Sequence, residues 1–153
     1  ITLTSEIDIL TYYLETQRMR FAENLKISFT VDPTLDIEKI KIPPMLAQPF
    51  IENSIEHGIQ HVDKQGELDI KFIKDGTRLL IEIIDNGIGR AASLKMQQNN
   101  LFHSKSVSTK ITNERILSLN KHAKQHISYN IIDLKDNRNN AIGTQVIINV
   151  PIT

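Results

Sequence analysis

Apolar and polar residues alternate one by one in three stretches of the chain, each about six residues long. This period of two is typical of a β-strand, because successive side chains point to opposite faces of a sheet. Asp75-Gly76, between the second and third stretches, predicts a tight hairpin turn. Two later apolar segments are predicted to form a final hairpin around the polar tip Asp136–Asn140. The predicted strands are Ile27–Val31, Leu68–Phe72, Leu79–Ile84, Ile127–Leu134 and Gly143–Ile152.

Elsewhere, apolar residues recur every three or four positions, which is the period of an α-helix. A first helix is predicted from a cap at Thr4 or Ser5 to about Arg20. A second is predicted to start at Pro43-Pro44, since proline is tolerated in a first turn, and to end near Gly58. The apolar side of the first helix is predicted to hold Ile7, Leu10, Leu14 and Met19.

The third quarter of the chain is less regular. A short helix is predicted after Arg90, and a longer one over about Thr109–Ala123, supported by Ile111, Ile116 and Leu119. Between them, Gln97–Thr109 is polar and aperiodic, which predicts a mobile loop.

Helices that alternate with hairpins do not build an all-parallel sheet. The order of elements therefore predicts an α+β fold, a two-layer α/β sandwich whose mixed, largely antiparallel sheet carries its helices on one face. The 153 residues suit one domain, and the 40% of hydrophobic residues is ordinary for a globular chain.

Charge and composition narrow the partners. Lys plus Arg equals Asp plus Glu at 18 each, so we expect no nucleic-acid partner. The chain has no Cys, which excludes disulfides and thiolate metal sites, and no apolar run long enough to span a bilayer. Because it begins at Ile1, in the approach to a helix, we expect it to be a piece of a longer protein.

The segment Asp85-Asn86-Gly87-Ile88-Gly89 follows the apolar run Leu79–Ile84 directly. The period of two places Asp85 on the same inward face as the apolar residues before it. A buried carboxylate is costly unless hydrogen-bond donors reach it, and the two glycines permit a close approach by a flat or phosphorylated ligand. The segment is predicted to be a ligand site; the alternative is an ordinary Asp-Asn-Gly turn.

Asn53 and His57 lie four residues apart on the second predicted helix, at one edge of its apolar face. From this edge both side chains can point into a cleft between helix and sheet. Asn offers a neutral oxygen to Mg²⁺, which takes few protein ligands besides waters and phosphates, and His57 can meet a phosphate. The alternative is a boundary Asn that bonds a nearby loop, beside a surface His.

Taken together, these segments resemble the ATP-binding domain shared by sensor histidine kinases, DNA gyrase, heat-shock chaperones and mismatch-repair ATPases, within which LytS-type sensor histidine kinases match best. The segment from Pro43 to Gly58 resembles that group's asparagine box. Asp85–Gly89 resembles its first glycine box, and Gly143–Ile152 its closing glycine-threonine strand. Leu3–Ile7, Tyr13-Leu-Glu and Arg20-Phe resemble the approach to the catalytic domain.

The resemblance implies a Bergerat-type fold that binds ATP with Mg²⁺ as a protein-histidine kinase domain. Asn53 is then the Mg²⁺ ligand, and Asp85 accepts a hydrogen bond from the adenine amino group. The remaining implied nucleotide-binding residues are His57, Gly87, Gly89, Ser108, Lys110 and Thr144. Residues 1–24 form a helical lead from a dimerisation and phosphoacceptor region, and residues 25–153 the catalytic domain. The role of Arg115, on the helix after the lid, stays open.

The resemblance also implies partners outside the chain: a dimerisation and phosphoacceptor domain of the same protein, and a response regulator. It implies a cytoplasmic domain of a membrane-anchored homodimer in the inner or plasma membrane. The stimulus and the cognate regulator are not encoded in these residues.

The chain departs from the family pattern at three places. Glu56 stands where the family often has Lys. The second glycine box is replaced by Ser106-Val107-Ser108-Thr109, in which Lys105 and Lys110 can substitute as flanking charges. None of the five histidines lies in a phosphoacceptor context, so the chain is not competent for histidine phosphorylation alone.

Two other functions stay open. A gyrase-like ATP hydrolase needs a water-activating Glu four residues before Asn53, where this chain has Pro49. A degenerate, non-catalytic binding module is consistent with the glycine-free lid.

Overall fold

The computed structural model describes residues 1–98 and 104–152, with the side chains of 97–98 and 104–109 left out. A five-stranded sheet with strand order β1-β2-β3-β5-β4 forms one layer. Only β1 and β2 pair in parallel, and all other neighbours are antiparallel. The strands are β1 (Leu25–Val31), β2 (Gly66–Asp75), β3 (Arg78–Asp85), β4 (Ser128–Lys135) and β5 (Ala141–Pro151). The predicted mixed, largely antiparallel sheet is confirmed.

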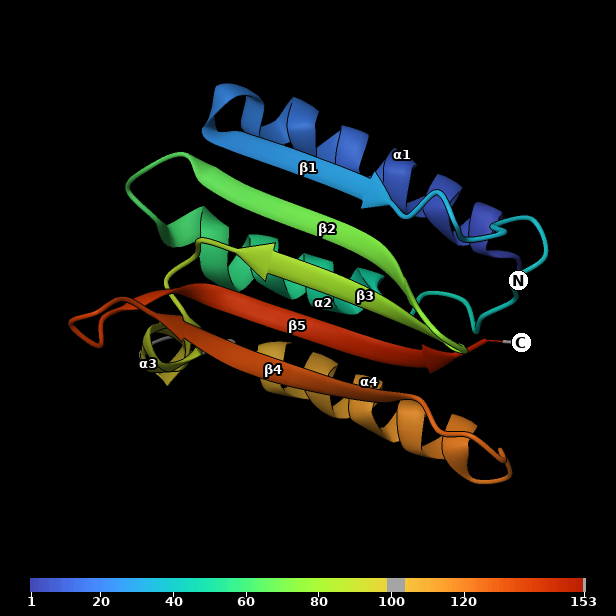
Figure 1. Cartoon of the computed structure of the whole chain (residues 1–153). Helices are drawn as coiled ribbons and strands as arrows, with labels where there is room; N and C mark the ends of the chain where they lie inside the picture. The colour runs from blue at the N-terminus through green and yellow to red at the C-terminus, as the bar shows by residue number, and fades with distance from the viewer. Residues whose placement is uncertain (99–103, 153) are drawn as a thin grey trace.

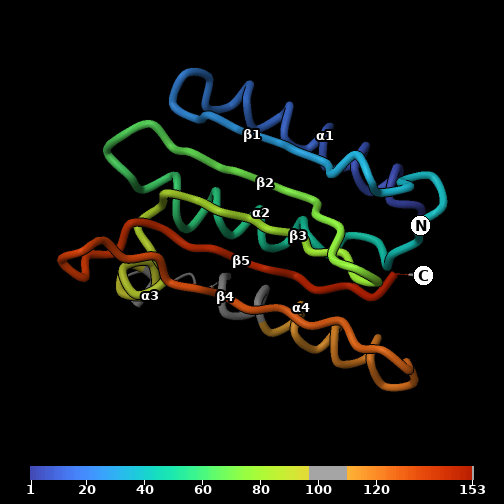
Figure 2. The backbone as a smooth tube through the Cα atoms, in the orientation of Figure 1, coloured from blue at the N-terminus to red at the C-terminus, as the bar shows by residue number. Residues whose placement is uncertain are grey.

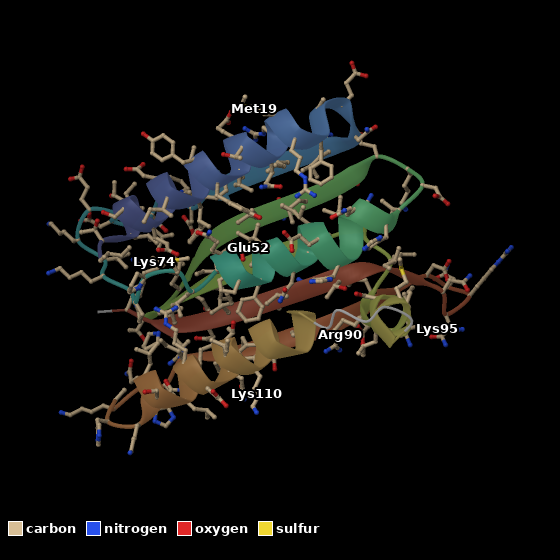
Figure 3. All side chains as sticks on the ribbon, turned by 180° about the vertical axis from the view of Figure 1, so that it is seen from behind. Met19, Glu52, Lys74, Arg90, Lys95 and Lys110 are labelled. Atoms are coloured by element: carbon tan, nitrogen blue, oxygen red, sulfur yellow. The ribbon has the colours of Figure 1, made fainter. Side chains whose placement is uncertain are left out.

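The second layer consists of helices on one face of the sheet (Figures 1 and 3). The tube in Figure 2 shows α1, α2 and α4 running along the strands, with α3 at one end. The helices are α1 (Leu3–Phe21), α2 (Gln48–Asn53), α3 (Arg90–Gln98) and α4 (Ser104–Asn120), with short turns η1 (Ala22–Asn24), η2 (Ser54–Gly58) and η3 (Ile59–His61).

The core lies between the two layers. Leu79, Ile81 and Ile83 of β3 are fully buried, and so are Ile51 and Ile55 of the second helical segment. On α1, Leu3 and Leu10 join the same core. The inward alternation predicted for β3 is confirmed, because a sheet covered on one face buries every second side chain.

The first helix ends at Phe21, close to the predicted Arg20, but its cap and one residue of its apolar side differ from the prediction. Its cap is Thr2, whose hydroxyl accepts from the Ser5 backbone N–H at 3.2 Å, so Thr4 and Ser5 lie inside the first turn. Met19 is 84% exposed and points away from the sheet (Figure 3), so its assignment to the apolar side is wrong.

The start of the second helix is also wrong in the prediction. Met45 has φ +58°, a left-handed conformation that interrupts any helix from Pro44, and α2 begins only at Gln48. The proline in its first turn is Pro49. A helix through Pro49 from Pro44 would also bring the proline ring against the Met45 carbonyl, so Pro49 fits only in the first turn.

The predicted loop over 97–109 is only partly described. Gln97 and Gln98 end α3, and residues 104–109 form the first turns of α4, so these parts of the loop prediction are wrong. Residues 99–103 lie outside the described residues. Within α4, Ile116 is buried, whereas Ile111 and Leu119 are exposed.

None of the helices in 1–98 and 104–152 combines the length and apolarity that a membrane span requires.

Candidate functional site

A cavity of about 530 Å³ opens between the helical layer and the end of the sheet where β3 stops. This size is in the range of small-molecule sites, about 300–1,000 Å³. Its walls come from α2 and η2 on one side, α3 and α4 on another, and β3, β4 and β5 below. The lining residues are Phe50, Asn53, Ser54, His57, Gly58, Asp85, Gly89, Arg90, Leu94, Lys110, Asn113, Tyr129, Ile131, Thr144 and Val146.

Asp85 is the last residue of β3 and lies at the floor of the cavity, where it is 4% exposed. Its Oδ1 accepts a hydrogen bond from the Gly87 backbone N–H at 2.8 Å. A carboxylate has about four lone-pair directions, so Asp85 can accept from this turn and from a ligand amino group together. The antiparallel register sets Thr144 of β5 directly beside it.

Two glycines make this arrangement possible. A Cβ on Gly143, which has φ +154°, would lie 1.9 Å from the Asp85 carbonyl oxygen. A Cβ on Gly87 would lie 2.5 Å from the Cα of Gly58. The backbones of β3, β5 and η2 therefore lie so close together that no side chain fits between them.

Asn86 stabilises the floor of the cavity through two side-chain hydrogen bonds. Its side-chain oxygen accepts from the Glu67 N–H at 2.7 Å, and its amide donates to the Gln65 carbonyl at 3.1 Å. These bonds tie the turn to the start of β2. The ordinary turn chemistry considered for Asp-Asn-Gly is thus present, and it holds Asp85 in place at the cavity.

Asn53 and His57 line the opposite wall, both half-buried. Between them the α-helix widens into the π-type turn η2, where the prediction has a continuous α-helix. Such turns occur often at functional sites. Phe50, one turn before Asn53, packs on Tyr129 of β4 with ring centroids 5.0 Å apart, which fixes this wall against the sheet.

Lys110 of α4 lines the cavity with an exposed side chain (Figure 3). Ser108 lies in the same helix, but its side chain is outside the described part of the chain. Gly89 is a lining residue, whereas Gly87 lies behind the wall against Gly58.

Arg90 is a cavity residue that the sequence reasoning missed. Its guanidinium donates two hydrogen bonds, both 2.8 Å long, to Asp133 of β4. The paired hydrogen bonds raise the pKa of Arg90 and lower that of Asp133. They tie α3 to the edge strand β4. In the sequence, Arg90 directly follows the segment Asp85–Gly89, and this position is the signal that points to it.

The comparisons with known proteins agree with this geometry. No family model matches the chain. The chain is 39% identical over 90 residues to the sensor protein LytS of Oceanobacillus iheyensis, over 58% of this chain and 15% of that protein. It is 33% identical over 89 residues to the sensor histidine kinase YesM of Bacillus subtilis. The chain is a relative of LytS-type sensor histidine kinases. Because it spans about 15% of these curated relatives, it corresponds to a small part of each.

Solved structures of low sequence identity share the fold of this chain. The catalytic domain of histidine kinase ThkA superposes over 99% of this chain and 94% of its own, with a TM-score of 0.62 and 14% identity. The mycobacterial sensor histidine kinase MprB superposes over 99% and 95%, also with a TM-score of 0.62. The chain therefore has the fold of a histidine kinase catalytic domain.

Proposed function

We propose that this LytS-type domain binds Mg-ATP in the cavity and serves as the catalytic domain of a two-component sensor histidine kinase. The observation that supports it most is the meeting of Asp85, Thr144 and Asn53 around one cavity, from three separate sequence segments. In a chain related to sensor histidine kinases, Asp85 is the residue type expected to bind the base. Thr144 is the type expected to bind a water molecule near it, and Asn53 the type expected to bind a metal ion.

In this proposal the base end of the cavity is Asp85. Its buried carboxylate, beside Thr144, accepts from the adenine amino group, so a purine with an oxygen at that position is rejected. Because Gly89 and the close-packed Gly87 carry no side chains, the nucleotide can lie directly against the backbone here. The apolar Ile131 and Val146 flank the base and exclude water.

The phosphate end lies toward α2, η2 and α4. Asn53 offers its side-chain oxygen to Mg²⁺, and His57 and Lys110 provide positive charge or hydrogen-bond donors to phosphate. Such a site suits Mg²⁺, which keeps waters and phosphates as most of its ligands. Bound there, Mg²⁺ supplies neutralisation of phosphate charge during transfer. Ser108 belongs to this side by its position in α4.

The phosphoryl group would pass to a histidine outside this chain, on a dimerisation and phosphoacceptor domain of the same protein, and then to a response regulator. The related proteins named LytS and YesM are a sensor protein and a sensor histidine kinase. A membrane-anchored homodimer with this domain in the cytoplasm is part of the same proposal.

Thermal unfolding with and without Mg-ATP tests the proposal. Nucleotide at 100 times its Kd should stabilise the fold by about 2.7 kcal/mol, which raises Tm by roughly 5–10 °C in a domain of this size. In Asn53→Ala, most of the stabilisation by nucleotide that depends on Mg²⁺ should be lost. No rise at millimolar Mg-ATP would contradict the proposal and favour a degenerate binding module. Rapid turnover of ATP by the chain alone would favour a hydrolase.

A further inference from the structure

Two helices that are distant in the sequence, α1 and α4, form hydrogen bonds to the turn that precedes α2. Glu6 of α1 accepts a hydrogen bond at its Oε2 from the Met45 backbone N–H, 3.0 Å away. Arg115 of α4 donates to the Met45 carbonyl at 3.1 Å and also to the Pro44 carbonyl. The peptide unit between Pro44 and Met45 is thus bonded from both sides, and the next unit is bonded from α4.

The local conformation explains why this turn needs external partners. Met45 has φ +58°, which residues other than glycine rarely adopt, and its peptide groups precede the hydrogen-bond ladder of α2. Glu6, on the other side, is 1% exposed, and a carboxylate so buried is costly unless it is hydrogen-bonded. The bond between Glu6 and Met45 therefore satisfies one of the two buried carboxylate oxygens and fixes an unfavourable backbone conformation, while Oε1 has no hydrogen-bond partner among the described residues.

A gap lined by side chains of both elements separates part of this turn from α4. A second cavity of about 290 Å³ lies there, lined by Pro44, Met45, Leu46, Pro49, Ile111, Thr112, Arg115 and Ile116. Where side chains leave space, dispersion contacts between the helices are lost. The hydrogen bonds from Arg115 connect α4 to the entry of α2 beside this cavity.

The two connected helices form facing walls of the main cavity. α2 and the turn after it supply Asn53 and His57, while α4 supplies Lys110 and Asn113, the latter only two residues before Arg115. We propose that Arg115, together with Glu6, is a positioning residue that sets the spacing of α2 and α4. Its effect on nucleotide binding rests on the function proposed above; its effect on helix spacing does not.

Spin-label distances test the spacing without any nucleotide. The chain has no Cys, so labels at Glu56→Cys in η2, the continuation of α2, and at Leu117→Cys in α4, both exposed positions, report the distance between the two helical walls. In Arg115→Ala the distance distribution should broaden, and the backbone amides of Met45–Gln48 and Phe50 should exchange hydrogen at least tenfold faster, with β2 and β3 unchanged. Arg115→Lys, which reaches a single carbonyl, should show a smaller effect. Arg138→Ala, at the exposed β4–β5 tip, is the matched control.

ATP affinity measured with and without Mg²⁺ provides the second readout. Arg115→Ala should reduce the gain in affinity that Mg²⁺ confers, whereas a general loss of stability would weaken both affinities alike. A distribution and exchange pattern like those of Arg138→Ala would overturn the positioning role. Broadening with an unaltered Mg²⁺ gain would overturn its link to the site. A wild-type chain that binds no Mg-ATP would defeat the proposed function, while distance and exchange still decide the role of Arg115.

Discussion

Asp85 combines a structural and a proposed chemical role in one side chain. It ends the buried row of β3, accepts from the Gly87 N–H, and lies beside Thr144 at the cavity floor. The absence of side chains at Gly87 and Gly143 keeps the surrounding backbones in contact. A carboxylate at this depth is thus held rigidly where it can distinguish an amino group from an oxygen.

Gly87→Ala should destabilise the fold by about 1–3 kcal/mol, because the added Cβ overlaps the Gly58 backbone, which has little room to move. Urea unfolding measures the change. Gly76→Asn is the control: nothing lies within 4 Å of a Cβ there, and Asn tolerates the φ of +59°, so we expect about 0.5 kcal/mol or less. Equal effects of the two substitutions would contradict the close contact at Gly87.

Tyr13 of α1 should make stability fall at alkaline pH. Burial, with Glu52 and Glu56 nearby, raises the pKa of Tyr13 from 10.0 to about 12. The folded state favours the neutral phenol, so this contribution is complete below pH 10 and is lost as pH rises through about 12. Unfolding free energies measured across this range should fall less steeply for Tyr13→Phe. Identical slopes for the two proteins would contradict the assignment.

The sequence could predict some site residues and not others, for identifiable reasons. Asp85 follows from the period of a single strand, and Asn53 and His57 from the edge of one helical segment. Arg90 and Tyr129 join the cavity because β5 pairs with β3 and brings β4 beside the end of β3, and no local pattern specifies that pairing. The hydrogen bond from Arg115 to Met45 joins residues 70 apart in the chain, so no local pattern predicts it.

At the scale of elements, α2 and its flanking turns depart most from simple periodicity. Phe50, Ile51 and Ile55, which are spaced as one face of a helix, are all buried, in agreement with the helical period of this segment. Its start was misplaced because the rule that favours proline in a first turn was applied to Pro44, although only Pro49 satisfies the backbone. The π-type turn at Ser54–Gly58 has no signal in the spacing of apolar residues.

The link between α3 and β4 should show a weak dependence on acid. The pKa of Asp133 is held below its ordinary value of 3.8 by hydrogen bonds from Arg90. A lowered carboxyl pKa stabilises the fold fully above the ordinary value and ceases to do so as pH falls through the lowered one. Both side chains are more than 40% exposed, so Asp133→Asn should cost less than about 1 kcal/mol at pH 7.

Chemical unfolding of wild type and Asp133→Asn at several pH values measures this cost. The difference between them should vanish once Asp133 is protonated in the wild type. A difference that persists at that acidity would show that the ion pair is not its source.

At the scale of the whole molecule, one covered face explains both fold and site. Three helices lie over a sheet whose order, β1-β2-β3-β5-β4, brings the ends of β3 and β5 to the centre (Figure 1). The two-layer arrangement followed from the alternation of helices and hairpins. The parallel pairing of β1 with β2 is set by the path of residues 32–65, whose turns have no regular period.

The central claim is that Asp85 recognises the base of ATP, and calorimetric titration of Mg-ATP into Asp85→Asn tests it most directly. The Asn side-chain oxygen can still accept from Gly87, so the fold should persist while its amide faces the adenine amino group without an acceptor. We expect the affinity to fall at least about tenfold, or 1.4 kcal/mol. Asp69→Asn is the control. Asp69 lies on β2 on the face of the sheet opposite to Asp85, so this variant should bind Mg-ATP as the wild type does. Unchanged affinity in a folded Asp85→Asn would contradict the account.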